Sequence, residues 1–296
     1  HIRRPMQTLS DKIENIILRH SNRGIDRMID ALKPGYCRRA AELCLASRGN
    51  VLIGTGFPVN GSFETDGPIG ALALSRVLAH VGSQPIFVCG PPLSGILKQQ
   101  FRTCEIPLLN WTESLPRVEE ALARFRPRLI ISVERPGAAS DKHYYNMRGQ
   151  DITAATMKFD LFFRKAACPT IAFGDGGNEV GMGNIKSRLA GLPITPSETK
   201  CDELVVATVS NWGVYGVIAE MSRIRGEDLL RLFDPERIAA YLVSHGSLDG
   251  VTWKPSRSED GFPMRIGLEI IQALRQTINI HASAVPTTQS EQRQSP

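Results

Sequence analysis

Acidic side chains gather in three glycine-containing stretches of the sequence that have the composition of binding loops. Glu64 and Asp66 lie in the first stretch, Glu134 begins the second, and Asp175 and Glu179 lie among the five glycines of the third. Each stretch comes after an apolar run that is typical of a buried strand. Because glycine lets a backbone take positive φ and approach a ligand closely, these stretches indicate loops that bind something.

The chemistry that such acids favour is the binding of a hard divalent cation. Several carboxylates brought to one place repel each other unless something positive lies among them. Mg²⁺, Mn²⁺ and Ca²⁺ all prefer carboxylate and amide oxygens as ligands. No histidine belongs to the three stretches, which disfavours zinc. The sequence therefore predicts a site for Mn²⁺ or Mg²⁺, with Ca²⁺ as a further option.

Most of these acidic residues also have a structural interpretation that the sequence leaves open. Asp66 precedes Gly67 and Pro68, and an aspartate in that position often caps a helix. Glu134 is followed by Arg135 and equally fits an ion pair with it. The glycine-rich stretch of residues 174–184 also fits a surface connection whose acids are simply solvated.

Other motifs that glycine-rich loops carry do not match this chain. In the dinucleotide-binding fingerprint that would begin at Gly174, Glu179 stands where the third glycine belongs. The sequence has no Gly-Lys-Ser or Gly-Lys-Thr and no Gly-x-Ser-x-Gly, and its six cysteines lie away from the three stretches. Dinucleotide binding, a P-loop and covalent catalysis are therefore disfavoured.

The elements that must position these residues follow an alternating pattern of strands and helices. Continuous apolar strands that alternate with helices predict an α/β fold with a mostly parallel sheet and helices on both faces. In such sheets the ligand site lies at the carboxyl ends of the strands. The loops that carry Asn60, Asn178 and Asn211 fall at the same edge as the acids. We expect strands over residues 50–54, 85–89, 128–133, 170–173 and 203–209, and helices that include 118–125 and 152–165.

Length, charge and cysteine usage narrow the class of protein. The 296 residues fit a single α/β domain over residues 11–283, and the polar end, residues 284–296, has the composition of a disordered tail. The net charge of +5 is scattered, which disfavours nucleic acid and fits a small anionic substrate. No apolar run is long enough for a membrane span, and the isolated cysteines indicate a reducing compartment such as the cytoplasm. Self-association stays open, as does a targeting peptide before His1.

Three motifs of the chain together resemble the D-glutamate cyclase C-terminal-domain family. They are FPVNGSFETDGPIGALAL at residues 57–74, VERPG at 133–137 with YYNMRG at 144–149, and FGDGGNEVGMGN at 173–184. The resemblance covers nearly the whole chain, and it implies a hydro-lyase that converts D-glutamate to 5-oxo-D-proline and water. If the resemblance extends to the compartment, the mitochondrial matrix is implied instead of the cytoplasm.

Residue roles for such a cyclisation can be assigned from the chemistry. A metal ion held by Glu64, Asp66, Asp175 and Glu179 would polarise a carboxylate oxygen, with Asp175 thereby a catalytic residue as well as a ligand. Glu134 would accept the ammonium proton. Arg148, rather than Lys186, would hold the α-carboxylate, because its fork matches that group. Further substrate contacts are expected from the amides of Asn60, Asn146, Asn178 and Asn211.

Two other functions fit the same residues. A metal-dependent phosphatase or other phosphoryl hydrolase also uses acidic clusters with Mg²⁺ or Mn²⁺, and a basic chain suits a phosphorylated substrate. A non-catalytic module that binds an anion or a metal is the third hypothesis. Release of 5-oxoproline from D-glutamate would indicate the cyclase, and release of phosphate from a phosphoester would indicate the phosphoryl hydrolase. Metal binding without turnover of either compound would indicate the binding module.

Overall fold

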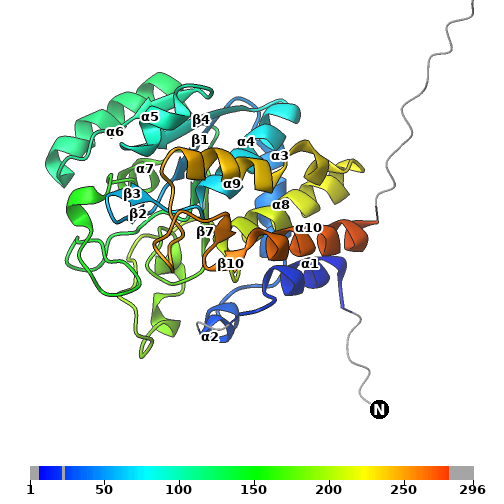
Figure 1. Cartoon of the computed structure of the whole chain (residues 1–296). Helices are drawn as coiled ribbons and strands as arrows, with labels where there is room; N and C mark the ends of the chain where they lie inside the picture. Colours follow the sequence, from blue (N-terminus) through cyan, green and yellow to red (C-terminus); the bar gives the residue numbers. More distant parts are fainter. Residues whose placement is uncertain (1–6, 22–23, 280–296) are drawn as a thin grey trace, which may run out of the picture.

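Six parallel strands form the central sheet of the protein in a computed structural model, which describes residues 7–21 and 24–279 (Figure 1). Their order across the sheet is β5-β4-β1-β6-β7-β8, and every neighbouring pair is parallel. The chain builds outward from β1 in one direction, then returns to β6 and builds in the other. That reversal opens a crevice at the carboxyl ends of β1 and β6. The strands are β1 (Asn50–Thr55), β4 (Gln84–Cys89), β5 (Thr103–Glu105), β6 (Leu129–Val133), β7 (Thr170–Gly174) and β8 (Glu203–Val206).

The sheet is buried on both faces, as continuous apolar strands predict. In β1, Val51 and Ile53 belong to the hydrophobic core on one face, whereas Leu52 belongs to the core on the other. Successive side chains of a strand point to opposite faces, so both faces must be covered by helices. The predicted α/β architecture is confirmed.

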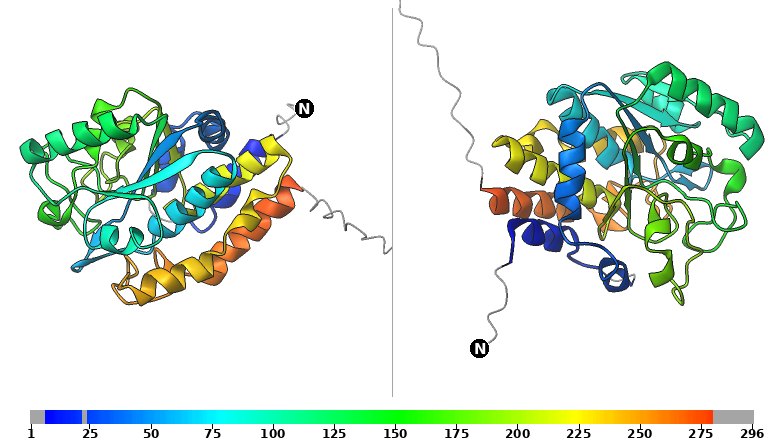
Figure 2. Two further views of the ribbon diagram at one scale, coloured as in Figure 1. Left: turned by 90° about the horizontal axis from the view of Figure 1, so that it is seen from above. Right: turned by 180° about the vertical axis from the view of Figure 1, so that it is seen from behind.

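The larger core is covered by helices from both ends of the described chain (Figure 2). Helix α8 is its centre: it is buried from Ser210 to Ser222 and packs against α1, α3, α4 and α10. Because α8 begins just after β8, its N-terminus lies at the carboxyl edge of the sheet. The helices of this layer are α1 (Leu9–Ile17), α3 (Tyr36–Ala46), α4 (Pro68–His80), α5 (Leu93–Leu97), α8 (Ser210–Arg225), the 3₁₀-helix η4 (Leu229–Leu232), α9 (Pro235–Ser244) and α10 (Met264–Ile278).

The smaller core, on the other face, is covered by shorter helices and by loop segments. Val118 of α6 and Phe162 of α7 are buried in it, together with Met182 from the glycine-rich stretch. The elements on this side are α2 (Ile25–Ile29), α6 (Trp111–Phe125), η1 (Thr153–Ala155), α7 (Asp160–Lys165), η2 (Met182–Asn184) and η3 (Lys186–Arg188).

Two short antiparallel hairpins complete the described structure. Strands β2 (Pro58–Val59) and β3 (Ser62–Phe63) form the first, and β9 (Ser258–Glu259) with β10 (Phe262–Pro263) forms the second. Glu64, just after the first hairpin, pairs with Leu248 in an isolated parallel bridge. The loop after β1 is thereby joined to the C-terminal part of the described chain.

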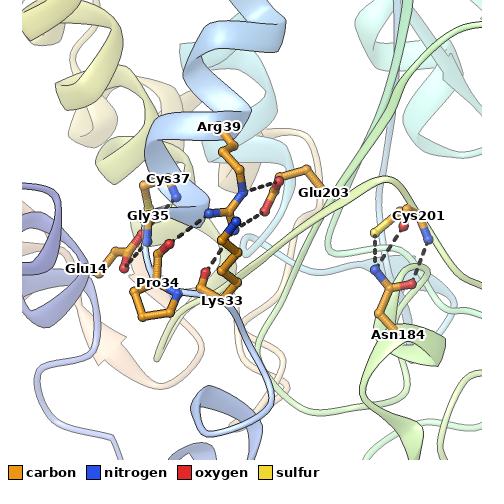
Figure 3. Close-up of polar contacts among 9 residues, drawn as sticks. All are labelled: Glu14, Lys33, Pro34, Gly35, Cys37, Arg39, Asn184, Cys201 and Glu203. Atoms are coloured by element: carbon orange, nitrogen blue, oxygen red, sulfur yellow. Dashed lines mark hydrogen bonds and ion pairs between the residues drawn. The ribbon is translucent and has the colours of Figure 1, made fainter.

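Polar contacts join α1 to the start of α3, α3 to β8, and the end of the glycine-rich stretch to the segment before β8 (Figure 3). Arg39 of α3 makes a bidentate ion pair with Glu203 at the start of β8, at 2.7 and 2.9 Å. The Glu14 carboxylate accepts hydrogen bonds from the backbone N–H groups of Gly35 and Cys37. These N–H groups at the start of α3 have no partner within the helix, so Glu14 satisfies them. Asn184, the last residue of the glycine-rich stretch, bonds both to the N–H and to the C=O of Cys201.

Several element boundaries differ from the sequence-based predictions. The single helix expected over residues 152–165 is wrong: only η1 and α7 form there. Lys158 donates instead to the carbonyl oxygens of Thr153 and Thr156, so these oxygens do not continue a helix. Helix α6 begins at Trp111, earlier than expected, because the Asn110 side chain accepts the Glu113 N–H and caps it. The last strand ends at Val206 rather than Val209.

Two further points concern the ends of the chain and the membrane. The predicted tail, residues 284–296, lies outside the described residues. In the part of the chain that the structure describes, no helix combines the length and apolar character that crossing a membrane requires.

Candidate active site

Three buried carboxylates meet at the carboxyl edge of the sheet. Asp66, Glu134 and Asp175 are each at most 5% exposed, and one oxygen of each lies within 4.8 Å of the others. Glu134 directly follows β6 and Asp175 directly follows β7, while Asp66 stands just before α4. The site therefore lies at the carboxyl ends of β6 and β7, beside the crevice between β1 and β6 where the sheet topology places a ligand.

The N-terminus of α8 supplies hydrogen-bond donors to all three carboxylates. The Ser210 N–H lies 3.2 Å from Asp66 Oδ2 and 3.3 Å from Asp175 Oδ2, and the Asn211 N–H donates to Asp66 Oδ1 at 3.0 Å. Ser210 Oγ donates to Glu134 Oε2 at 2.5 Å. A helix N-terminus carries partial positive charge, which stabilises negative groups there.

Burial and mutual repulsion hold these carboxyls toward their protonated forms. Burial, followed by the charge of Asp260, raises the pKa of Asp66 from 3.8 to about 7. Burial, then the charges of Glu179 and Asp66, raises the pKa of Glu134 well above its ordinary value. The pKa of Asp175 is likewise raised well above its ordinary value by burial and then by Glu134. A cation between the three would remove the cause of the repulsion.

The backbone is shaped to bring Glu134 and the start of α4 together. Glu134 has φ of +46°, in the left-handed region that residues other than glycine rarely occupy. Gly67, with φ of +92°, passes so close that an added Cβ would lie 2.8 Å from the Glu134 Cβ. The sequence also allowed Asp66 to cap a helix and Glu134 to pair with Arg135. Asp66 accepts the Gly67 N–H at the start of α4 but also accepts the Asn211 N–H of α8. The Arg135 guanidinium donates to the carbonyl oxygens of Gly56 and Met157.

Glu179 organises the glycine-rich loop from within. Its two carboxylate oxygens accept the backbone N–H groups of Asp175, Gly176 and Gly177, at 3.2, 2.6 and 2.7 Å. The loop is therefore curled around this carboxylate, which holds Asp175 at its place after β7. Glu179 still contributes negative charge beside Glu134.

A cavity of about 470 Å³ opens above the carboxylates. Its acidic end is lined by Glu134 and Asp175, while Asp66 lies in the buried cluster behind it. Glu64 also lines the cavity and lies against Gly250, where an added Cβ would come within 2.4 Å of its carboxylate. The predicted site residues that line the cavity are Glu64, Glu134, Asn146, Arg148, Asp175, Asn178 and Glu179.

Arg148 lies at the cavity on a loop that is braced by its own polar groups. Its guanidinium carbon lies 3.8 Å from the centre of the Trp253 ring, and it donates to the Val251 carbonyl. The Asn146 side-chain oxygen accepts the Arg148 N–H, and Asn178 donates to the Tyr145 carbonyl. Both amides thus connect the Arg148 loop to itself or to the glycine-rich loop.

Two of the predicted substrate contacts lie elsewhere. Asn60 is exposed at the turn of the β2–β3 hairpin with φ of +45°, outside the residues that line the cavity. Asn211 is wholly buried: its side-chain oxygen accepts the N–H groups of Gly67 and Gly70, and its amide donates to Glu259. Asn211 therefore holds the start of α4 and Glu259 in position.

Sequence reasoning missed three residues of the β9–β10 region. Asp260 and Trp253 line the cavity, and Asp260 has φ of +49° in the turn of the hairpin. Glu259, fully buried, accepts hydrogen bonds from Asn211, Trp212 and Tyr215 of α8. The one local signal is Asp260-Gly261, a hairpin-turn dipeptide, but no long apolar run accompanies it.

The donor set of the cluster fits a hard divalent cation. Asp66, Glu134 and Asp175 offer carboxylate oxygens that lie close enough together to share one ion. Mn²⁺ and Mg²⁺ prefer such oxygen ligands over nitrogen or sulfur ligands. The three carboxyls can hold a metal, and their burial would exclude competing water.

Comparison with known proteins gives the same assignment as the sequence motifs. The family model "D-glutamate cyclase-like, C-terminal" matches residues 13–275. The human protein "D-glutamate cyclase, mitochondrial" is 27% identical over 308 aligned positions, which cover 86% of this chain and 49% of that protein. The chain thus spans about half the length of this curated relative, which is an enzyme. On the match to the family model, the chain belongs to the D-glutamate cyclase-like C-terminal family.

Proposed function

We propose that the chain is a hydro-lyase that cyclises D-glutamate to 5-oxo-D-proline and water. The observation that carries the proposal is the buried cluster of Asp66, Glu134 and Asp175 at the N-terminus of α8, of which Glu134 and Asp175 line the cavity. Family membership supports the same reaction class.

The reaction asks for a base and for an activated carboxylate. The α-ammonium must lose a proton before its nitrogen attacks the γ-carbon, and one γ-oxygen must leave as water after it gains protons. Glu134 accepts the first proton, because burial raises its pKa and so makes its carboxylate a stronger base than an exposed glutamate. A divalent cation bound by Asp66 and Asp175 would supply Lewis acidity toward the γ-carboxylate.

Arg148 supplies the contact that orients the substrate. Its guanidinium lies over the Trp253 ring, and one of its N–H groups donates to the Val251 carbonyl, which leaves further N–H groups for a carboxylate. With the α-carboxylate at Arg148, the amine and the γ-carboxyl extend toward the acidic end of the cavity. Asn146 and Asn178 set the position of the loop that carries Arg148.

The test is turnover by this chain with added metal. Incubation with D-glutamate and Mn²⁺ should yield 5-oxo-D-proline, measured by chiral chromatography. Asp175→Asn should abolish most Mn²⁺ binding in calorimetric titration and also abolish turnover. Asp141→Asn, an exposed aspartate outside the cavity lining, is the matched control and should change neither.

Two results would contradict the proposed reaction, and a third would contradict the role of Asp175. Release of phosphate from a generic phosphoester, without 5-oxoproline from D-glutamate, would assign a phosphoryl hydrolase. Mn²⁺ binding without turnover of either would assign a binding module. Unchanged Mn²⁺ titration of Asp175→Asn would remove Asp175 from the metal site.

A further inference from the structure

The cavity is larger than the substrate of the proposed reaction. It measures about 470 Å³. A water molecule takes about 30 Å³ in the liquid, so the cavity has the room of roughly 15 waters. D-Glutamate has ten non-hydrogen atoms, and bonded atoms pack more closely than separate waters do. Free D-glutamate therefore leaves a large part of the cavity unfilled.

Apolar side chains form a large share of the cavity lining. We call them the apolar collar: Phe57 and Val59 before and within the β2–β3 hairpin, Leu192 and Ile194 after η3, and Met147 with Trp253 beside Arg148. These side chains come from separate segments of the chain and surround the same space. An acidic end with an apolar collar is the arrangement of a site that orients a reacting group and buries an apolar body.

A residue of the collar packs against the loop that carries Asp175. An added Cβ at Gly177 would lie 3.5 Å from Ile194 Cγ2 and 3.0 Å from a Leu189 methyl. Gly177 stands two residues after Asp175, in the loop that is curled around Glu179. Ile194 lines the same cavity as Asp175 and Gly176, so a group attached to the reacting carbon can lie against Ile194.

The proposed function determines which end of the substrate can carry such a group. The α-amine must be free to attack, and the α-carboxylate is held by Arg148. The γ-acyl position alone can be extended. A substituent there lies on the group that leaves during cyclisation.

We propose that the site takes D-glutamate whose γ-carboxyl is joined through an amide to an apolar amine, an inference that rests on the proposed cyclase function. The α-nitrogen attacks the γ-carbonyl carbon and forms the lactam C–N bond, while the amide C–N bond breaks. The proton lost by the attacking nitrogen passes to the leaving nitrogen. The products are 5-oxo-D-proline and the free amine, and no water, oxidant or reductant takes part.

Two γ-amides with equally basic leaving amines test this inference. The chain, with Mn²⁺, is given D-glutamic acid γ-methylamide and γ-hexylamide, and the released amine and 5-oxo-D-proline are measured. One buried methylene corresponds to about a four-fold gain in binding, so partial burial of five predicts a kcat/KM for the hexylamide at least about 10-fold higher. Ile194→Asp, and separately Leu192→Asp, should bring that ratio toward one. Ile224→Asp, at an exposed position near the far end of α8, should keep it.

The outcomes separate this inference from the proposed function. Equal kcat/KM for the two amides, or no turnover of either by a chain that cyclises D-glutamate, overturns the inference and leaves the proposed function standing. Turnover of the hexylamide without turnover of D-glutamate supports the inference and replaces the substrate of the proposed function. No turnover of any of the three compounds overturns both.

Discussion

Glu134 combines the properties of a residue that carries a proton. It is buried, its pKa is raised by burial and by neighbouring acids, and Ser210 Oγ fixes one of its oxygens. Its positive φ shows that the backbone takes an unfavoured conformation to place this carboxyl, a cost that functional sites often contain. The same carboxyl is close enough to Asp66 and Asp175 to bind a shared metal.

Glu134→Gln separates the base from the ligand. The amide keeps the size of the side chain but cannot accept a proton at neutral pH. We expect turnover of D-glutamate to fall by about 10²-fold or more while Mn²⁺ binding persists in calorimetric titration.

The control for this substitution is Glu236→Gln, an exposed position on α9 that should leave turnover unchanged. Near-normal turnover of Glu134→Gln with intact metal binding would rule out Glu134 as the base. Loss of Mn²⁺ binding would assign it as a ligand instead.

Helix α8 organises the site as an element. Its first N–H groups bind Asp66 and Asp175, and one turn of side chains, from Asn211 to Tyr215, binds Glu259. Glu259 precedes Asp260, which lines the cavity. The β9–β10 hairpin and the carboxylate cluster are thus positioned by the same helix.

Glu259→Ala should destabilise the protein. The substitution leaves three buried donors of α8 without their acceptor, and an unsatisfied buried donor costs about 1–3 kcal/mol. We expect the free energy of unfolding in urea to fall by about 3 kcal/mol or more. Glu269→Ala, whose carboxylate is exposed on α10, should stay within about 0.5 kcal/mol of the original chain. A similarly small change for Glu259→Ala would show that the contacts with α8 do not hold the hairpin.

For the whole molecule, the clustered acids make stability depend on pH and on metal. The pKa of Asp66 is raised from 3.8 to about 7, so between these values the folded chain holds a proton that the unfolded chain has lost. The stability contributed by that proton is fully present below pH 3.8 and is lost as pH rises through about 7. The stability that a bound metal adds should instead increase with pH, because the metal binds only deprotonated carboxylates.

Thermal unfolding at pH 5 and pH 8 tests this coupling. With a chelator, the Tm should be lower at pH 8, and Asp66→Asn should reduce the difference. Mn²⁺ at 100 times its Kd should add about 2.7 kcal/mol of stability. The added stability at a fixed Mn²⁺ concentration should be greater at pH 8 than at pH 5. A chelated chain that is more stable at pH 8, with no change in Asp66→Asn, would contradict the pKa assigned to Asp66.

The alternation of strands and helices was readable from the sequence because it depends on local patterns. Continuous apolar runs predicted buried parallel strands, and the carboxyl ends of parallel strands share an edge, which placed the loops of Glu134 and Asp175 near each other. The strand β5 escaped prediction because its three residues lack an apolar run. The helix expected over residues 152–165 failed because Lys158 bonds to the carbonyl oxygens that would continue it.

Tertiary structure decided what each polar side chain of these loops contacts. The sequence placed Glu179 and Asn211 beside the site, but only folding shows that Glu179 binds its own loop and that Asn211 joins α4 to Glu259. Asp260 and Trp253 reach the cavity from a region far along the chain, without a preceding strand to indicate them. A sequence pattern reports the period of an element, whereas the partners of a side chain depend on segments that are distant in sequence.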